Sequence, residues 1–159
     1  MTKNILYLIF LALLFSACEK DDICLLPTTP KLILRFYDAE NPNSFKNVEH
    51  LSIWAEGKDT INTYKDVTID SIALSLDTNS SQTIYNLKTS VSGNIVDNVY
   101  NKITIDYTTE AIFVSRSCGL KVNFNTVTID SDNAWFQSIA PNSIPTIDHE
   151  TSAHFEIYH

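Results

Sequence analysis

Glycine is scarce in this sequence, because its 159 residues include only Gly57, Gly93 and Gly119. Three glycines so far apart cannot form the Gly-rich phosphate loop or the Gly-x-Gly-x-x-Gly turn that lets a backbone approach a pyrophosphate. Basic residues are also few: 11 Lys and Arg stand against 19 Asp and Glu, which gives a net charge of −8. Binding to nucleic acid depends on cationic neutralisation of phosphates, so the composition predicts no nucleic acid partner.

Motifs of known catalytic chemistry are absent as well. The chain has no Gly-x-Ser-x-Gly elbow, no His-Glu-x-x-His helix and no Ser-x-x-Lys motif. His149, His154 and His159 are five residues apart, a spacing that alternates them between the faces of a strand instead of gathering them at a metal. Asp130 to Asn133 resembles the opening of a calcium loop, but Ala134 supplies no ligand oxygen. We therefore predict no catalytic residue, no metal site and no cofactor.

Residues that favour β-strands are abundant. The chain holds 18 Ile, 8 Val and 16 Thr against 9 Ala. Short alternations of apolar and polar residues recur every 8 to 12 residues or so, with turn residues between them. This pattern predicts an all-β fold, a two-layer antiparallel β-sandwich of immunoglobulin-like type. The alternating segments are 31–37, 51–55, 72–76, 83–87, 103–107, 112–118, 120–124 and 153–157.

Turn residues predict how some of these strands connect. The tight turn Glu56-Gly57-Lys58-Asp59 predicts a hairpin in which residues 60–64 return beside the strand before the turn. The segment 135–140 fits either one helical turn or a short strand, and we favour the strand. Pro141 and Pro145 are expected to bracket a loop.

The N-terminus carries an eleven-residue apolar run, residues 5–15. Such a run is too short to span a bilayer, which takes about 20 residues, and it is typical of a secretory signal peptide. Ser16-Ala17-Cys18 follows the run directly and, with its last residues, resembles the bacterial lipobox, whose Cys thiol takes a diacylglycerol. We expect a removed signal peptide (1–17), a lipid-anchored tether (18–30) and a β-sandwich domain (31–159). The alternative is an ordinary secretory signal that a Cys happens to follow.

A short charged motif follows the expected lipidation site. Lys20, Asp21 and Asp22 resemble the lipoprotein export signal of Bacteroidota-type bacteria. The resemblance implies an outer-membrane lipoprotein that is exposed at the cell surface. The alternative is a solvated charged tether on a lipoprotein that faces the periplasm.

With Cys18 assigned to lipid, Cys24 and Cys118 remain as an even pair in an oxidising compartment. We predict a disulfide between them, which would close a loop of about 95 residues and fasten the tether to the domain. The competing interpretation makes Cys118 a nucleophile whose pKa the neighbouring Arg116 lowers.

Two kinds of surface feature could serve an envelope protein. Thr60, after Asp59, and Ser71, after Asp70, resemble the Asp-Thr/Ser-apolar acceptor used for O-glycosylation in Bacteroidota envelopes. Aromatic residues are numerous enough to form a sugar-binding platform, although packing within the core is their more usual role. The aromatic candidates are Tyr37, Trp54, Tyr64, Tyr85, Tyr100 and Trp135.

Several motifs together resemble an uncharacterised family of small Bacteroidota lipoproteins, a domain of unknown function. They are a Tyr that closes one strand (Tyr107), a Ser-x-x-Cys-Gly step (Ser115, Cys118 and Gly119) and an early Cys (Cys24). The resemblance implies no known activity. We therefore expect a non-catalytic binding or assembly module, held to the membrane by lipid, with an envelope protein or glycan as partner. The alternative is an envelope hydrolase whose site is not visible in linear sequence.

Overall fold

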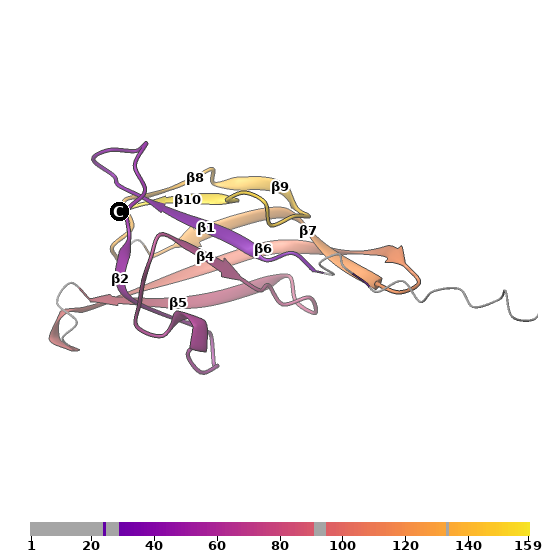
Figure 1. The fold of residues 1–159 in the computed structure, drawn as a ribbon, viewed down its shortest axis with the longest axis horizontal. Coiled ribbons are helices and arrows are strands. Elements are labelled where there is room, and N and C mark those ends of the chain that lie inside the picture. Colours follow the sequence, from indigo (N-terminus) through magenta and orange to yellow (C-terminus); the bar gives the residue numbers. More distant parts are fainter. Residues whose placement is uncertain (1–23, 25–28, 91–94, 133) are drawn as a thin grey trace, which may run out of the picture.

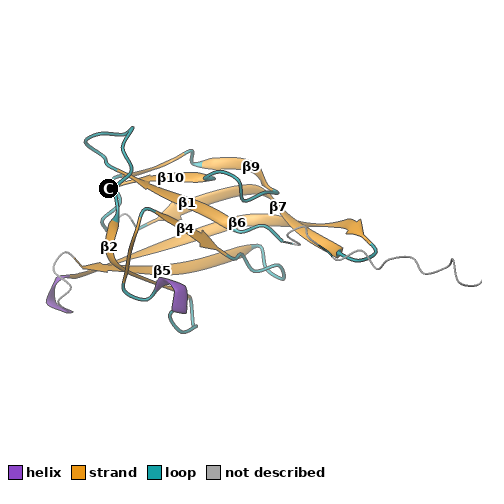
Figure 2. Ribbon diagram, in the orientation of Figure 1, coloured by secondary structure: helices purple, strands orange, loops and turns teal. Residues whose placement is uncertain are grey.

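The computed structural model describes Cys24 and residues 29–90, 95–132 and 134–159. Cys18 and the Lys20-Asp21-Asp22 motif therefore lie outside the described residues. Two β-sheets face each other in a sandwich (Figures 1 and 2), which confirms the all-β, two-layer prediction. Helix is limited in the described residues to two 3-10 turns, η1 (Asn62–Tyr64) and η2 (Ile95–Asp97). No helix in these residues is long and apolar enough to cross a membrane.

The smaller sheet has four strands in the order β4-β1-β10-β8. Its two central strands, β1 and β10, are the first and last of the domain and run parallel, with Tyr37 opposite Tyr158. The other pairs are antiparallel, so the predicted antiparallel pairing holds in this sheet for all but the central pair. The strands are β1 (Leu32–Tyr37), β4 (Ser71–Leu74), β8 (Ser138–Ala140) and β10 (Phe155–Tyr158).

The larger sheet has six strands in the order β3-β2-β5-β6-β7-β9 and is antiparallel throughout. Within it, β5, β6 and β7 follow one another both in the chain and in space. The narrower immunoglobulin-like description stays a prediction. The strands are β2 (Val48–Ala55), β3 (Val67–Ile69), β5 (Gln82–Ser90), β6 (Asn98–Ser115), β7 (Gly119–Ser131) and β9 (Ser143–Ile147).

The core lies between the sheets, and alternation along each strand builds it. In β1 the side chains of Leu32, Leu34 and Phe36 are fully buried, while the residues between them point outward. Successive strand side chains point to opposite faces, so this pattern places one face of β1 on the other sheet. Each buried side chain of this kind contributes roughly 1.5 to 3 kcal/mol. Fully buried partners from the larger sheet are Leu51, Ile53, Leu87, Ile103, Ile105 and Phe124.

The predicted return strand at 60–64 does not form. Thr60 makes a single bridge to Trp54, and the chain then enters η1. Tyr64 explains the difference, because its side chain is buried and its hydroxyl accepts from the backbone N of Ala73 (2.7 Å) and donates to the Ala73 carbonyl (3.2 Å). These bonds draw the chain away from β2 and toward β4 of the other sheet.

Three other strand predictions need correction. The segment 103–107 and the first part of the segment 112–118, up to Ser115, belong to one 18-residue strand, β6, because pairing with β7 continues through a register shift after Asp106. Residues 116–118 form the turn that follows it. Pro145 lies inside β9, where an edge strand tolerates a residue that donates no hydrogen bond. In the segment 135–140 only the last three residues form a strand, since Trp135 and Phe136 turn toward Phe36.

Candidate functional site

A partly exposed group of aromatic rings lies where β1 and β10 end. Tyr37 and Tyr158 are the last residues of these strands and stand opposite each other, with ring centroids 5.5 Å apart and ring planes 31° apart. Phe45, from the loop after β1, packs its ring 5.1 Å from that of Tyr37 and is 55% exposed. The alternation of β1 turns Tyr37 away from the core, so the rings lie on the outer face of the smaller sheet. We call Tyr37, Phe45 and Tyr158 the aromatic cluster.

Charged groups border the aromatic cluster. The guanidinium carbon of Arg35 lies 3.8 Å from the ring centroid of Phe45, a cation–π contact, and a guanidinium nitrogen of Arg35 is 3.5 Å from a carboxylate oxygen of Asp70. The Tyr158 hydroxyl donates to Oε2 of Glu156 (2.7 Å), and this bond raises the pKa of Tyr158. The cluster therefore combines flat aromatic rings with charged groups of both signs at its border.

A shallow groove beside β5 is the place to look for the polar groups that the hydrolase alternative needs. Its volume is about 480 Å³, and its lining includes Glu56, Asp77 and Tyr85. Burial raises the pKa of Tyr85 to about 12, and a hydrogen bond from Asn86 lowers the pKa of Glu56. Both shifts move away from neutrality, so Glu56 stays ionised and Tyr85 stays protonated at pH 7.

The spacing of His149, His154 and His159 predicted alternation along one strand, but the three side chains lie in different surroundings. His154 is buried, its Nδ1 accepts from the backbone N of Ile33 (2.9 Å), and burial lowers its pKa. His149 lies beside it, with ring centroids 5.4 Å apart. His159 instead meets Phe36 edge-on, 5.9 Å away. Among the described residues no three His, Cys, Asp or Glu are grouped to hold a metal ion.

The predicted glycosylation sites differ in how their hydroxyls are engaged. Ser71 lies within β4, and its hydroxyl donates to the carbonyl of Leu34 (3.4 Å). Thr60 follows the turn after β2, lies outside any strand and is partly exposed. Both residues are partly exposed, and O-glycosylation stays a prediction for both.

Of the aromatic residues predicted as a platform, Tyr37 belongs to the cluster. Tyr64 and Tyr85 are buried, and Trp135 packs on Phe36. The sequence-based reasoning did not select Phe45, because a single Phe in a loop carries no periodicity. Elsewhere, Trp54 and Tyr100 form a separate edge-to-face pair (6.3 Å), and Asp130 and Ser131 of the calcium-like segment belong to β7.

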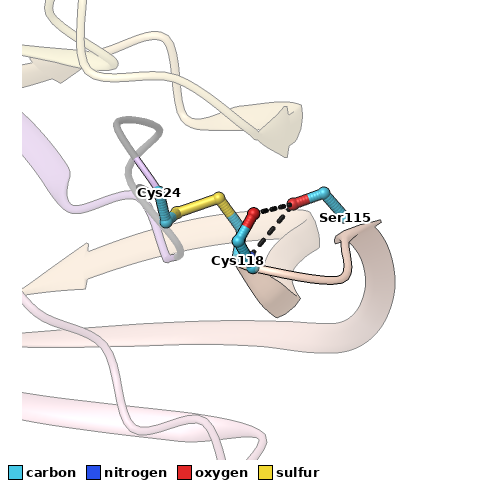
Figure 3. The surroundings of a disulfide bond; sticks show 4 residues. Cys24, Ser115 and Cys118 are labelled. Carbon is cyan, nitrogen blue, oxygen red and sulfur yellow. Dashed lines mark hydrogen bonds between the residues drawn. A yellow bond between two sulfur atoms is a disulfide. The ribbon is translucent and has the colours of Figure 1, made fainter. Parts of the chain in front are cut away.

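The Cys24–Cys118 disulfide is present, with Cα atoms 4.9 Å apart (Figure 3). Cys118 lies in the turn between β6 and β7, and its backbone N donates to Oγ of Ser115 (3.0 Å). The disulfide prediction is confirmed, and Cys118, lacking a free thiol, is no nucleophile in this state. The bond ties the segment before β1 to the tip of the β6–β7 hairpin.

These features define a small, disulfide-bonded β-sandwich with an aromatic cluster on one outer face. The model of a family of unknown function, DUF6452, matches residues 50–159. This match covers more than half of the chain, so the protein belongs to that family, as the resemblance to an uncharacterised domain predicted. Tyr107, Ser115 and Cys118 lie within the matched region, and Cys24 precedes it. Comparisons with curated proteins and with solved structures found no match.

Proposed function

We propose that the protein is a lipoprotein, anchored at Cys18 in the outer membrane and exposed at the cell surface, whose sandwich is a non-catalytic module that binds an envelope glycan. The aromatic cluster is the observation that carries the binding proposal. The C–H face of a sugar ring packs on aromatic rings, while its hydroxyls need hydrogen-bond partners at the rim. Arg35 and Glu156 supply a donor and an acceptor beside the rings.

A glycan fits the cluster better than a protein does. The cluster holds three rings, whereas a standard protein interface takes about 800 Å² on each partner. The net charge of −8 further favours a neutral or basic ligand. A protein partner is the competing occupant, which the test below distinguishes.

Sequence and compartment support the lipid anchor. The Ser16-Ala17-Cys18 step after an apolar run resembles a lipobox, and Lys20-Asp21-Asp22 resembles a surface-export signal. The disulfide also supports an extracytoplasmic location, because disulfides form and persist in oxidising compartments. A hydrolase is the weaker proposal, because the sequence contains no motif of known hydrolase chemistry.

Glycan binding can be tested with a pair of matched variants. Phe45 and Tyr100 are both 55% exposed, but only Phe45 belongs to the cluster. In affinity electrophoresis against envelope polysaccharide fractions, Phe45→Ala should weaken retardation at least tenfold, and Tyr100→Ala should leave it unchanged. Equal effects of the two variants would contradict glycan binding at the cluster. If no polysaccharide retards the protein and the cluster cross-links specifically to another protein, the partner is a protein and not a glycan.

The anchor and its export have separate tests. Cys18→Ser should abolish incorporation of labelled fatty acid, and a wild type without label would contradict the anchor. Replacement of Lys20, Asp21 and Asp22 with Ala should preserve the fatty-acid label but abolish antibody labelling of the protein on intact cells. A triple variant that stays fully accessible would contradict the export signal.

A further inference from the structure

The long strands β6 and β7 extend beyond the sandwich as a two-stranded arm. β5 pairs with β6 only as far as Asp106, and β9 pairs with β7 only as far as Phe124. Beyond these residues the ladder shows β6 and β7 paired with each other up to the turn at 116–118. We call residues 109–123 the hairpin arm, and it projects from one end of the long axis (Figure 1).

The tip of the hairpin arm carries an apolar face. Phe113 and Leu120 stand directly opposite each other and are 65% and 61% exposed. Ala111, which is exposed, and Val122, which packs partly against the core, form the next pair on the same face, because side chains two residues apart in a strand share a face. Large apolar side chains gathered on a projecting surface indicate a contact with something outside the chain.

The charge of the tip is opposite to that of the whole chain. Residues 111–122 include Arg116 and Lys121 but no Asp or Glu, whereas the chain has a net charge of −8. Arg116 is exposed in the turn, and Lys121 stands opposite Ile112 on the second face of the arm. The nearest carboxylate on the arm, that of Glu110, accepts from the amide of Asn125 (2.9 Å). Apolar side chains beside basic ones suit the interface of an anionic lipid bilayer.

The disulfide decides which part of the domain lies nearest the anchor. It fixes Cys24 at the arm's turn, and Cys18 precedes Cys24 by six residues. A fully extended chain covers at most about 3.6 Å per residue, so this tether reaches roughly 20 Å. Any lipid on Cys18 therefore holds the tip, and not the body of the sandwich, close to the membrane surface.

We propose that the tip of the hairpin arm docks on the anionic lipid surface that holds the acylated Cys18, with Phe113 and Leu120 among the headgroups. This proposal rests on the lipid anchor proposed above. The lipid chains and the tip then form two contacts with one membrane, which fix the orientation of the domain. The C-terminus lies at the other end of the long axis (Figure 1), and with it the last residue of β10, Tyr158. Docking thus directs the aromatic cluster away from the bilayer.

Photo-cross-linking in intact cells tests the docking with a control on the same strand. Phe113 and Tyr100 are both exposed aromatic residues of β6, 13 residues apart and therefore about 44 Å from each other along the strand. We replace each in turn with p-benzoylphenylalanine in the full-length protein and measure adducts with phospholipid by mass spectrometry. The adduct yield should be at least tenfold higher at 113 than at 100. The same substitution at Leu120 should match the yield at 113.

Fatty-acid labelling of the same cells separates the docking from the anchor. A labelled protein whose positions 113 and 120 give no more lipid adduct than position 100 would overturn the docking and leave the anchor standing. Adducts with a protein in place of phospholipid at 113 would overturn it as well. Absence of the fatty-acid label would overturn the anchor, and lipid adducts at 113 in that protein would still support a membrane-facing tip.

Discussion

Replacing both Cys24 and Cys118 with Ala should lower the free energy of unfolding by about 2 kcal/mol. In the unfolded chain the disulfide closes a loop across a sequence separation of 94 residues, for which the chain-entropy model gives about 4.7 kcal/mol. The folded chain is restricted as well. In the folded chain the disulfide closes a loop between Cys24 and Leu32, the first residue of β1, across a sequence separation of eight. The same model assigns about 2.5 kcal/mol to a loop of that length, and only the difference stabilises the fold.

Urea unfolding of a chain that begins at Glu19 measures this effect without interference from lipid or Cys18. Tryptophan fluorescence follows the transition, since Trp135 packs on Phe36 in the core. The free energy of unfolding in water follows from linear extrapolation, and the denaturant dependence should rise in the variant, whose unfolded state is less compact. A loss above about 4 kcal/mol would refute the reasoning, because the stretch before β1 would then have to stay fixed without the bond. No loss at all would refute it from the other side.

Three further predictions use the same measurement. Tyr107→Phe should cost about 2 kcal/mol, because the hydroxyl donates to the carbonyl of Asp77 (2.8 Å) and is also hydrogen-bonded to Oγ1 of Thr83 (2.5 Å), so the substitution removes two hydrogen bonds; a variant as stable as wild type would contradict this. Gly119→Ala should cost about 1 kcal/mol, since φ is +71° there and no atom lies within 4 Å to clash, so a larger loss would point to packing instead of backbone strain. Burial lowers the pKa of His154 below its ordinary value of 6.5, so the folded state binds its proton less readily than the unfolded state, and stability should be full above pH 6.5 and fall below it. His154→Asn should flatten that fall, leaving the part due to His159, whose pKa burial also lowers; an unchanged pH profile would contradict the assignment.

Alternation was enough to predict most strands, because a strand with one buried face carries a local signal. β1 shows this directly, with buried and outward residues in strict order. β6 does not alternate where it enters the hairpin arm, since Thr108 to Ala111 are exposed on both faces. A strand with no buried face has no alternation to read, and this explains why one strand was predicted as two.

The candidate site was less predictable because its parts meet only through tertiary pairing. Tyr37 and Tyr158 come together because β1 and β10 pair, and no local pattern encodes that pairing. Phe45 reaches Tyr37 because its loop folds back, with the backbone N of Asp38 donating to the Ser44 carbonyl (3.0 Å). The disulfide was predictable for a different reason: once Cys18 is assigned to lipid, only Cys24 and Cys118 remain, and this count needs no knowledge of the fold.

The parallel pairing of β1 with β10 sets an order on the folding of the chain. The β5-β6-β7 meander forms from neighbouring segments, so it can assemble as soon as those residues are available. One edge of β1 pairs with β4, but its other edge has to wait for β10, which follows it by more than a hundred residues, as the bond from Ile33 to His154 spans 121. Pairings of such long range form slowly, and an unpaired strand edge is open meanwhile to other chains and to proteases. The smaller sheet, which carries the aromatic cluster, is therefore the part of the domain most dependent on protection during its biogenesis.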